Sequence, residues 1–270
     1  MNRSEYQLLQ FEQTDAILTI SINRPEKLNT VNGRMHTELS TVFRDVAADE
    51  SVNVVILTGV GRTFCAGGDL NWFQTITPAE LDLVFVEARQ IIIDLLEVPQ
   101  PVISAIGGAA KGLGATLALL SDISIAVEGA QIADPHVSVG IGAGDGGAII
   151  WPWLIGAARA KQYLLTGDSI EATEAARIGL INQAVPAIKF AATVTELAER
   201  LAHGPQRAIR ATKASVNKIL RDTANLVLDT SLALEKECFH TADHREAIAA
   251  FLAKRSPRFG VPSHSGSVAD

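Results

Sequence analysis

Short apolar runs and stretches with helical spacing alternate along the first half of the chain. The runs are rich in β-branched residues and predict strands at 16–22, 54–58, 102–106 and 123–127. The run VVILT at 54–58 is almost continuously apolar, which is typical of a strand buried on both faces. Apolar residues recur with helical spacing over 36–48, and residues 115–122 predict a further short helix.

A capping box marks the start of a longer helix. In Thr77-Pro78-Ala79-Glu80 the threonine and the glutamate can cap each other's backbone, and proline suits the first helical position. Pro99 and Pro101 predict an end near Glu97. Strands, glycine-containing loops and helices thus follow one another, an order that predicts an α/β fold with short, largely parallel strands.

The chain beyond Pro186 is predicted to be helical throughout, because apolar residues recur with helical spacing over 189–203, 206–238 and 244–253. We therefore expect a core over residues 1–188, a helical C-terminal region over 189–256, and a flexible tail over 257–270, which contains Gly, Ser and His.

Composition excludes several classes of function. The formal net charge of −7 gives no electrostatic basis for binding nucleic acid or an anionic membrane. Two cysteines in 270 residues do not make a disulfide framework and indicate a reducing compartment. The first fifteen residues lack an apolar segment, and the longest apolar stretch, 102–120, is interrupted by Lys111 and by glycines. We expect a soluble, cytoplasmic protein.

Two glycine loops carry the strongest chemical signal. FCAGGDL (64–70) and GGAAKGLG (107–114) each follow a predicted buried strand and lead towards a helix. Backbone N–H groups at such a turn lack internal partners and can donate to an anionic oxygen. Two donors that converge on one point make an oxyanion hole, in which each is worth about 3–4 kcal/mol to an enolate or acyl transition state. Cys65 is expected to be a small core residue, and Asp69 to anchor its turn or cap the next helix.

Four segments in the same order resemble the crotonase, or enoyl-CoA hydratase/isomerase, superfamily. They are NRPEKLNTVN (23–32), FCAGGDL (64–70), residues 103–123 and ARIGLINQAVP (176–186). The resemblance implies a spiral of ββα units followed by a helical trimerisation region, with a homotrimer or a dimer of trimers. It also implies an oxyanion hole for a thioester carbonyl, with no cofactor other than the CoA of the substrate.

Position by position, the resemblance implies that the two oxyanion donors are the N–H groups of Gly68 and Leu113. Hydratases of the family use two glutamates, whose positions fall here on Thr116 and His136. The ordinary two-glutamate mechanism therefore does not transfer to this chain. The family contacts CoA at positions that correspond to Arg24, Lys27, Leu28 and Ala66.

A narrower likeness concerns DPHVSVGIGAGDGG (134–147). This stretch resembles a loop of 6-oxocamphor hydrolase, a crotonase-fold enzyme that cleaves a C–C bond in β-diketones with a histidine and an aspartate at this spacing. The likeness implies catalytic roles for His136 and Asp145. The stretch LALE (232–235) resembles a C-terminal segment of the same enzyme with a glutamate near the site, which implies a catalytic role for Glu235 as well. Histidine suits the role of acid and base because its ordinary pKa is near ~6.5, and an aspartate can orient it or carry a second proton.

Two enzyme classes remain open. The first, favoured because it is the default of the superfamily, is a lyase or isomerase acting on an acyl-CoA. The alternative is a β-diketone hydrolase that needs no CoA. Binding of CoA distinguishes them. A non-catalytic scaffold or RNA-binding member of the fold is a third alternative, and the acidic charge disfavours RNA binding.

Two other motifs are set aside. His240, Asp243 and His244 have a spacing compatible with a metal, but no further ligand is evident, and a solvated helix end is expected instead of a metal site. Gly142, Gly144 and Gly147 match GxGxxG, but Trp151-Pro152 is expected to interrupt the helix that a dinucleotide-binding turn requires.

Overall fold

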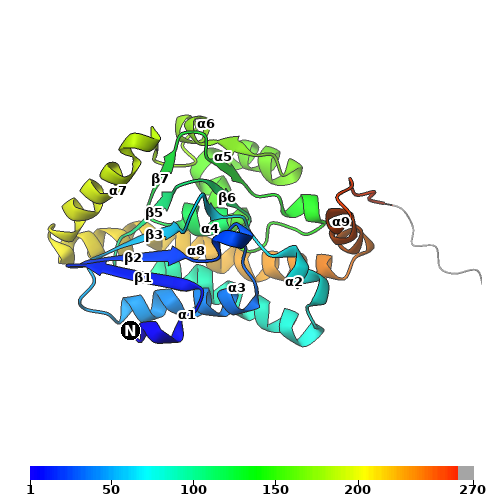
Figure 1. Cartoon of the computed structure of the whole chain (residues 1–270), viewed down its shortest axis with the longest axis horizontal. Coiled ribbons are helices and arrows are strands. Elements are labelled where there is room, and N and C mark those ends of the chain that lie inside the picture. Colours follow the sequence, from blue (N-terminus) through cyan, green and yellow to red (C-terminus); the bar gives the residue numbers. More distant parts are fainter. Residues whose placement is uncertain (261–270) are drawn as a thin grey trace, which may run out of the picture.

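The computed structural model describes residues 1–260, which form two β-sheets surrounded by helices (Figure 1). The larger sheet has the strand order β1-β2-β3-β5-β7-β10. Only the β1–β2 pair in it is antiparallel. Its strands are β1 (Leu9–Thr14), β2 (Ile17–Ile22), β3 (Val54–Gly59), β5 (Val102–Ile106), β7 (Ile123–Val127) and β10 (Gln183–Val185).

The smaller sheet has the order β4-β6-β8-β9. Its strands are β4 (Thr63–Cys65), β6 (Ala109–Lys111), β8 (Gln131–Ala133) and β9 (Ile170–Glu171). The pairs β3/β4, β5/β6 and β7/β8 each place one strand in the large sheet and the next in the small sheet. Each pair is followed by helix, so the chain forms the expected spiral of ββα units.

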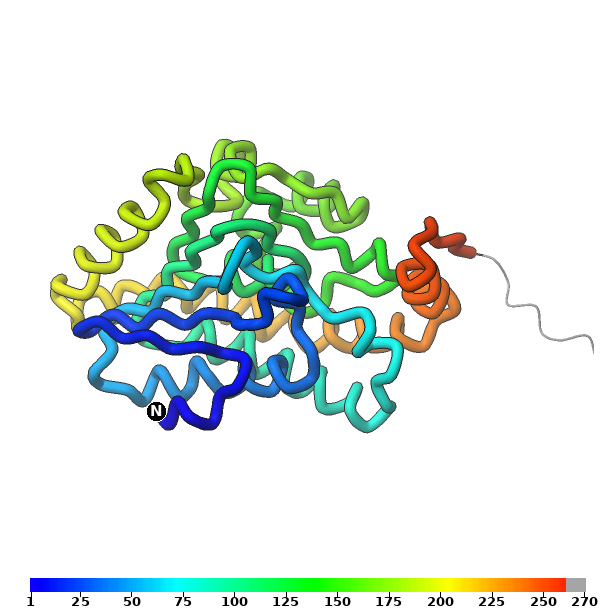
Figure 2. Tube along the Cα trace, viewed as in Figure 1, coloured from blue at the N-terminus to red at the C-terminus, as the bar shows by residue number. Residues whose placement is uncertain are grey.

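Nine α-helices surround the sheets within the described residues. They are α1 (Gly33–Ala47), α2 (Leu70–Thr75), α3 (Pro78–Glu97), α4 (Leu113–Leu120), α5 (Gly147–Thr166), α6 (Ala172–Arg177), α7 (Ala187–Ala202), α8 (Gln206–Phe239) and α9 (Ala242–Leu252). None of these helices is long and apolar enough to cross a membrane. Helices α7 and α9 lie at opposite ends of the long axis (Figure 2).

The central strands of the large sheet, β3, β5 and β7, are largely buried on both faces. On β3, Val55 and Leu57 join the main core, whereas Val54 and Ile56 pack with Val194 of α7 in a second apolar cluster. The main core also contains residues of α1, α3, α4 and α8. The continuously apolar strand at 54–58 is therefore confirmed, and the C-terminal helices α7 and α8 share the cores of the preceding chain.

The elements expected from apolar spacing are present, including the capping box of α3. Strand β1 was not predicted, and neither were the two- and three-residue strands of the small sheet. The expected interruption at Trp151-Pro152 is wrong. Helix α5 begins at Gly147 and contains Pro152, and its kink falls at Gly156, where φ is 76°. Residues 257–260 carry no helix or strand, and the rest of the expected tail lies outside the described residues.

Candidate active site

One cavity, of about 160 Å³, is lined by both glycine loops and by the segment that follows β8. Its walls are largely apolar, with aromatic rings from Trp72, Phe73, Phe85 and Phe239. The titratable side chains that line it are His36, His136, Asp145 and Glu235. An apolar cavity with a few converging polar groups is the usual form of a small-molecule site.

The two glycine loops lie against each other at the cavity. A Cβ on Gly67, whose φ is 87°, would lie 3.0 Å from the carbonyl oxygen of Lys111 and 3.8 Å from the Cα of Gly112. Gly112 also has a positive φ, 51°, and it forms the N-cap of α4. Glycine is required at both positions because of the left-handed backbone, and at Gly67 also because of the close approach.

The backbone N–H groups of Gly68 and Leu113 are the candidate oxyanion donors. Neighbouring N–H groups are engaged, since Asp69 donates to the carbonyl of Val31 (2.9 Å) and Gly112 to that of Ala133 (3.0 Å). No protein acceptor for the N–H of Gly68 or Leu113 is found within residues 1–260. Leu113 is the first residue of α4, where the helix leaves its N–H groups unpaired. Both residues line the cavity.

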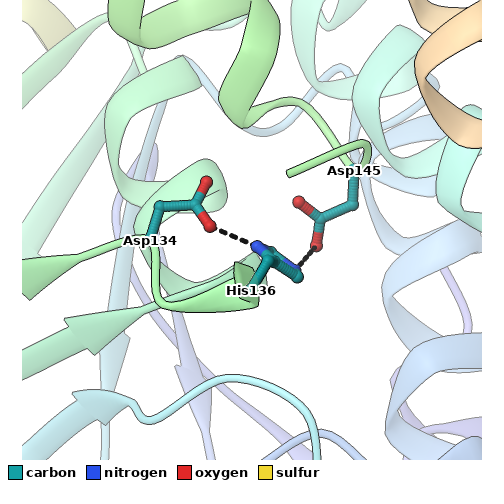
Figure 3. Close-up of side chains that lie close together, drawn as sticks. All are labelled: Asp134, His136 and Asp145. Atoms are coloured by element: carbon teal, nitrogen blue, oxygen red, sulfur yellow. Dashed lines mark hydrogen bonds and ion pairs between the residues drawn. The ribbon is translucent and has the colours of Figure 1, made fainter. Parts of the chain in front are cut away.

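His136 lies between two carboxylates (Figure 3). Its Nδ1 forms a short hydrogen bond with Oδ1 of Asp134, and its Nε2 lies 3.4 Å from Oδ2 of Asp145. Nε2 is also 3.9 Å from Oε1 of Glu235, which comes from α8. All four side chains are buried. A Cβ on Gly112 would lie 3.5 Å from Cε1 of His136, so the imidazole is next to the loop that carries the Leu113 donor.

The glycines of DPHVSVGIGAGDGG make room for these carboxylates. A Cβ on Gly144 would lie 2.6 Å from Oε2 of Glu235, and one on Gly147 would overlap Oδ2 of Asp134. Gly146 has φ 115°, a backbone that L-residues rarely adopt. The sequence therefore places glycine where the chain must pass close to buried acidic side chains.

Thr116 supports the cluster from α4. It is fully buried, and its Oγ1 donates to Oδ1 of Asp145 over 3.3 Å. At this position, where the resemblance would place a glutamate, the chain thus has a hydroxyl that holds a carboxylate.

Burial and charge act in opposite directions on the pKa of His136. Burial alone lowers it, but the charges of Asp134 and Asp145 and hydrogen bonds to them hold the pKa well above its usual range. Burial, together with the charge of Asp145, raises the pKa of Glu235 well above its usual range, although His136 opposes this. Its Oε2 is buried without a hydrogen-bond partner in the described chain. His136 is therefore charged near neutrality, and Glu235 keeps its proton to a higher pH than an exposed glutamate.

The sequence reasoning missed Asp134. Asp134 is the partner of Nδ1 of His136 and therefore orients the ring, a role that was expected of Asp145. Asp145 faces Nε2 instead. The signal was present in the stretch Asp134-Pro135-His136. An aspartate two residues before a histidine at a strand end is also compatible with an ordinary turn, so spacing alone does not reveal the contact.

Of the four positions expected to contact CoA, one lines the cavity and three do not. Ala66 lines the cavity, whereas Arg24, Lys27 and Leu28 do not. Arg24 is engaged by Asp69 (3.2 Å) and by a backbone carbonyl. Lys27 is exposed, and Leu28 accepts the N–H of Ala66 through its carbonyl.

The structural roles expected for Asp69 and Cys65 are confirmed, whereas the solvated helix end expected at His244 is wrong. Asp69 caps α2 by accepting the N–H of Asn71. Cys65 is fully buried, and burial raises the pKa of its thiol to about 12. His244 is buried, with Nδ1 2.7 Å from the carbonyl of Val139.

Asp134, His136 and Asp145 offer ligand atoms within 4.8 Å of one another, a spacing that a metal ion could bridge. Both ring nitrogens of His136 already face carboxylates, and its raised pKa means that a proton competes with any metal for Nε2. The donor set therefore fits a charged histidine better than a metal.

The fold and the cavity define an α/β enzyme with backbone donors beside a buried histidine–carboxylate cluster. The family model described as enoyl-CoA hydratase/isomerase matches residues 12–262. The chain belongs to this family, within the crotonase superfamily. It is 36% identical over 248 residues to 1,2-epoxyphenylacetyl-CoA isomerase of Escherichia coli, covering 90% of this chain and 94% of that protein.

Solved structures agree with this assignment. An enoyl-CoA hydratase/isomerase from Mycobacterium paratuberculosis superimposes with a TM-score of 0.84 at 33% identity, covering 90% of this chain and 97% of that chain. A β-diketone hydrolase from the cyanobacterium Anabaena, bound to (S)-3-oxocyclohexyl acetic acid, has a TM-score of 0.81 at 29% identity, covering 88% and 98%. The two neighbours share the fold of this chain but are described as different enzymes, so the fold leaves the reaction itself open.

Proposed function

We propose that this enzyme converts an acyl-CoA thioester through an enolate whose oxygen accepts hydrogen bonds from the N–H groups of Gly68 and Leu113. One observation carries the proposal: two N–H groups without protein acceptors line the same apolar cavity as a buried histidine–carboxylate cluster. Such donors stabilise the negative charge that develops on a carbonyl oxygen.

In this proposal His136 and Asp145 move the proton. Asp145 removes a proton from a carbon of the acyl chain, and the electron pair moves to the thioester oxygen. His136, which is charged in this environment, donates its Nε2 proton to another carbon as the enolate collapses. The proton on Asp145 then returns to His136 across 3.4 Å, which restores the resting state. The raised pKa of His136 thus favours the acid role of this residue in the resting enzyme.

A second candidate is hydrolysis of a C–C bond in a β-diketone without CoA. It is favoured by the histidine at a position where family hydratases carry a glutamate, and by the similarity to the β-diketone hydrolase. Water would add to one carbonyl after losing a proton to a carboxylate of the cluster. The C–C bond would then break, and the leaving enolate would occupy the same pair of N–H donors.

Following the resemblance, we propose a homotrimer or a dimer of trimers, a cytoplasmic location, and no cofactor beyond the CoA of the substrate.

The test is turnover and binding with a panel of acyl-CoAs and a panel of cyclic and open β-diketones. We expect acyl-CoA turnover that falls by at least ~10²-fold in His136→Ala and in Asp145→Asn, with a double variant scarcely worse than the worse single variant, because the two act as one unit. His203→Ala, at an exposed histidine, is the matched control and should keep full activity. Diketone cleavage without acyl-CoA binding would select the second candidate, and full turnover in His136→Ala would reject both.

A further inference from the structure

A second histidine–carboxylate pair lies at the same cavity and is not used by the proposed reaction. Nδ1 of His36, on α1, is 2.7 Å from Oε2 of Glu87, on α3. The hydroxyl of Thr37 donates to the other oxygen of Glu87, also over 2.7 Å. His36 and Glu87 are only 4% and 8% exposed. Glu87 thus fixes the ring, and Nε2 is the nitrogen available to the cavity that His36 lines.

This pair stands apart from the reacting cluster. Three of the four titratable side chains that line the cavity, His136, Asp145 and Glu235, belong to that cluster, and His36 is the fourth. No hydrogen bond or ion pair in the described chain joins His36 to the other three. The residues of α3 that line the wall beside it, such as Val84, Phe85 and Ala88, are apolar. A polar group placed alone in an apolar wall fixes the orientation or identity of a ligand.

The need to join α1 to α3 does not explain why position 36 is a histidine. The Thr37–Glu87 hydrogen bond already joins these helices, and they pack through apolar side chains such as Leu39 and Ile91. An apolar residue at position 36 would complete that packing without bringing a ring nitrogen to the cavity. The second ring nitrogen has no protein partner among the described residues, so the position suits a ligand in the cavity that supplies one.

Aromatic rings connect this pair with the oxyanion donors. The ring centroid of His36 is 6.1 Å from that of Trp72, and Trp72 is 5.3 Å from Phe73. A Cβ on Gly68 would overlap the ring of Phe73. Two aromatic side chains therefore lie between His36 and the Gly68 donor, so His36 is placed to meet a part of the acyl chain other than the thioester carbonyl.

We propose that His36, held by Glu87, is a binding residue for a hydroxyl group on the acyl chain of the substrate. The proposal rests on the acyl-CoA function proposed above. With Nδ1–H donated to Glu87, a neutral ring offers a lone pair at Nε2, and a charged ring offers an N–H. A hydroxyl can donate to the first and accept from the second, whereas a methylene can do neither. The substrate class is thus a hydroxyacyl-CoA, with the hydroxyl beyond the reacting carbons.

The experiment compares matched pairs of acyl-CoAs by calorimetry: hexanoyl-CoA and octanoyl-CoA against the same chains with one hydroxyl at successive carbons from C4 outwards. One hydrogen bond of ordinary net strength should make the best hydroxylated member bind about 5–10-fold more tightly to the wild type. His36→Leu should remove this preference and leave binding of the plain chain unchanged or tighter. His36→Gln, which keeps a hydrogen-bonding side chain, should retain part of it.

Thermal unfolding of each variant separates binding from structure. A purely structural His36 predicts a lower Tm with both members of a pair weakened equally, and this result would overturn the proposal. Equal affinity of the wild type for plain and hydroxylated chains at every position would also overturn it, and would leave the acyl-CoA function intact. Failure of every acyl-CoA to bind would overturn the proposed function and this site together.

Discussion

At the scale of single residues, the charge of His136 is set by two carboxylates. The negative charge of Asp134 is the larger of the two that raise the pKa of His136 against the effect of burial. Asp134→Asn should therefore lower the pKa of His136, measured by NMR titration of the labelled imidazole. Asp168→Asn, at an exposed aspartate, should leave that pKa unchanged. An unchanged pKa in Asp134→Asn would mean that Asp134 does not hold the charge of His136.

The raised pKa of Glu235 predicts how the free energy of unfolding depends on pH. Its pKa in the fold lies above that of an unfolded chain, about 4.3, so the native state binds the extra proton between the two values. The free energy of unfolding must then fall as the pH rises through this window. Gln keeps the shape of the neutral acid, so the stability of Glu235→Gln relative to wild type should increase with pH.

Denaturant unfolding at pH 5, 6, 7 and 8, at one protein concentration, measures this effect. Glu237→Gln is the matched control, because Glu237 lies on the same helix and is exposed. Its curve should run parallel to that of the wild type. A stability difference between Glu235→Gln and wild type that is independent of pH would contradict the raised pKa.

Sequence reasoning reached His136, Asp145 and Glu235 because glycine spacing and a family likeness pointed to them. It did not reach His36, Glu87 or Asp134. His36 and Glu87 are 51 positions apart and meet only through the packing of α1 against α3. Each alone looks like a polar residue on a helix, so no local pattern identifies the pair.

At the scale of elements, the start of α4 supplies one of the two backbone donors. Leu113 is the first residue of that helix, a position where proline is well tolerated. Leu113→Pro should therefore leave the fold intact while removing the N–H, and should lower turnover by about 10²–10³-fold. Leu113→Ala, which loses the side chain but keeps the N–H, is the control and should stay within a few-fold of wild type.

Circular dichroism and the Tm check that both variants of Leu113 fold. Equal loss of turnover in Leu113→Pro and Leu113→Ala would show that the side chain matters and the N–H does not. The corresponding substitution at Gly68 is less informative, because the Cβ of an alanine there would overlap the ring of Phe73.

The elements that could be predicted are those with a helical period, a capping signal or a continuous apolar run. Helix α3 and strand β3 fall into this class. Strands such as β4 (Thr63–Cys65) and β6 (Ala109–Lys111) have three residues, too few for an alternation to stand out. Strand β1 does alternate, with Leu9 buried and Gln10 exposed, and it could have been predicted. Pro152 misled because α5 continues through it, and the break in the helical backbone falls at Gly156 instead.

At the scale of the whole molecule, α8 has two faces. Leu220, Ala224, Leu228 and Leu232 are buried in the core, and Glu235 reaches the cavity from the same side. Truncation before this helix would remove core and site together and would not test assembly by itself. The other face carries exposed apolar residues, namely Val216, Ile219, Leu226 and Leu234.

These exposed residues recur with helical spacing and form one stripe along α8. Leu226 is 80% exposed, and an apolar stripe of this kind is typical of a protein–protein interface. If a second copy of the chain covers it in the proposed trimer, Leu226→Glu should reduce the assembly to smaller species, measured by light scattering coupled to size exclusion. Lys218→Glu is the control, because it places the same charge on another face of the helix and breaks only an exposed ion pair. A monomeric wild type would contradict the proposed assembly, and an unchanged mass for Leu226→Glu would exclude this stripe as its interface.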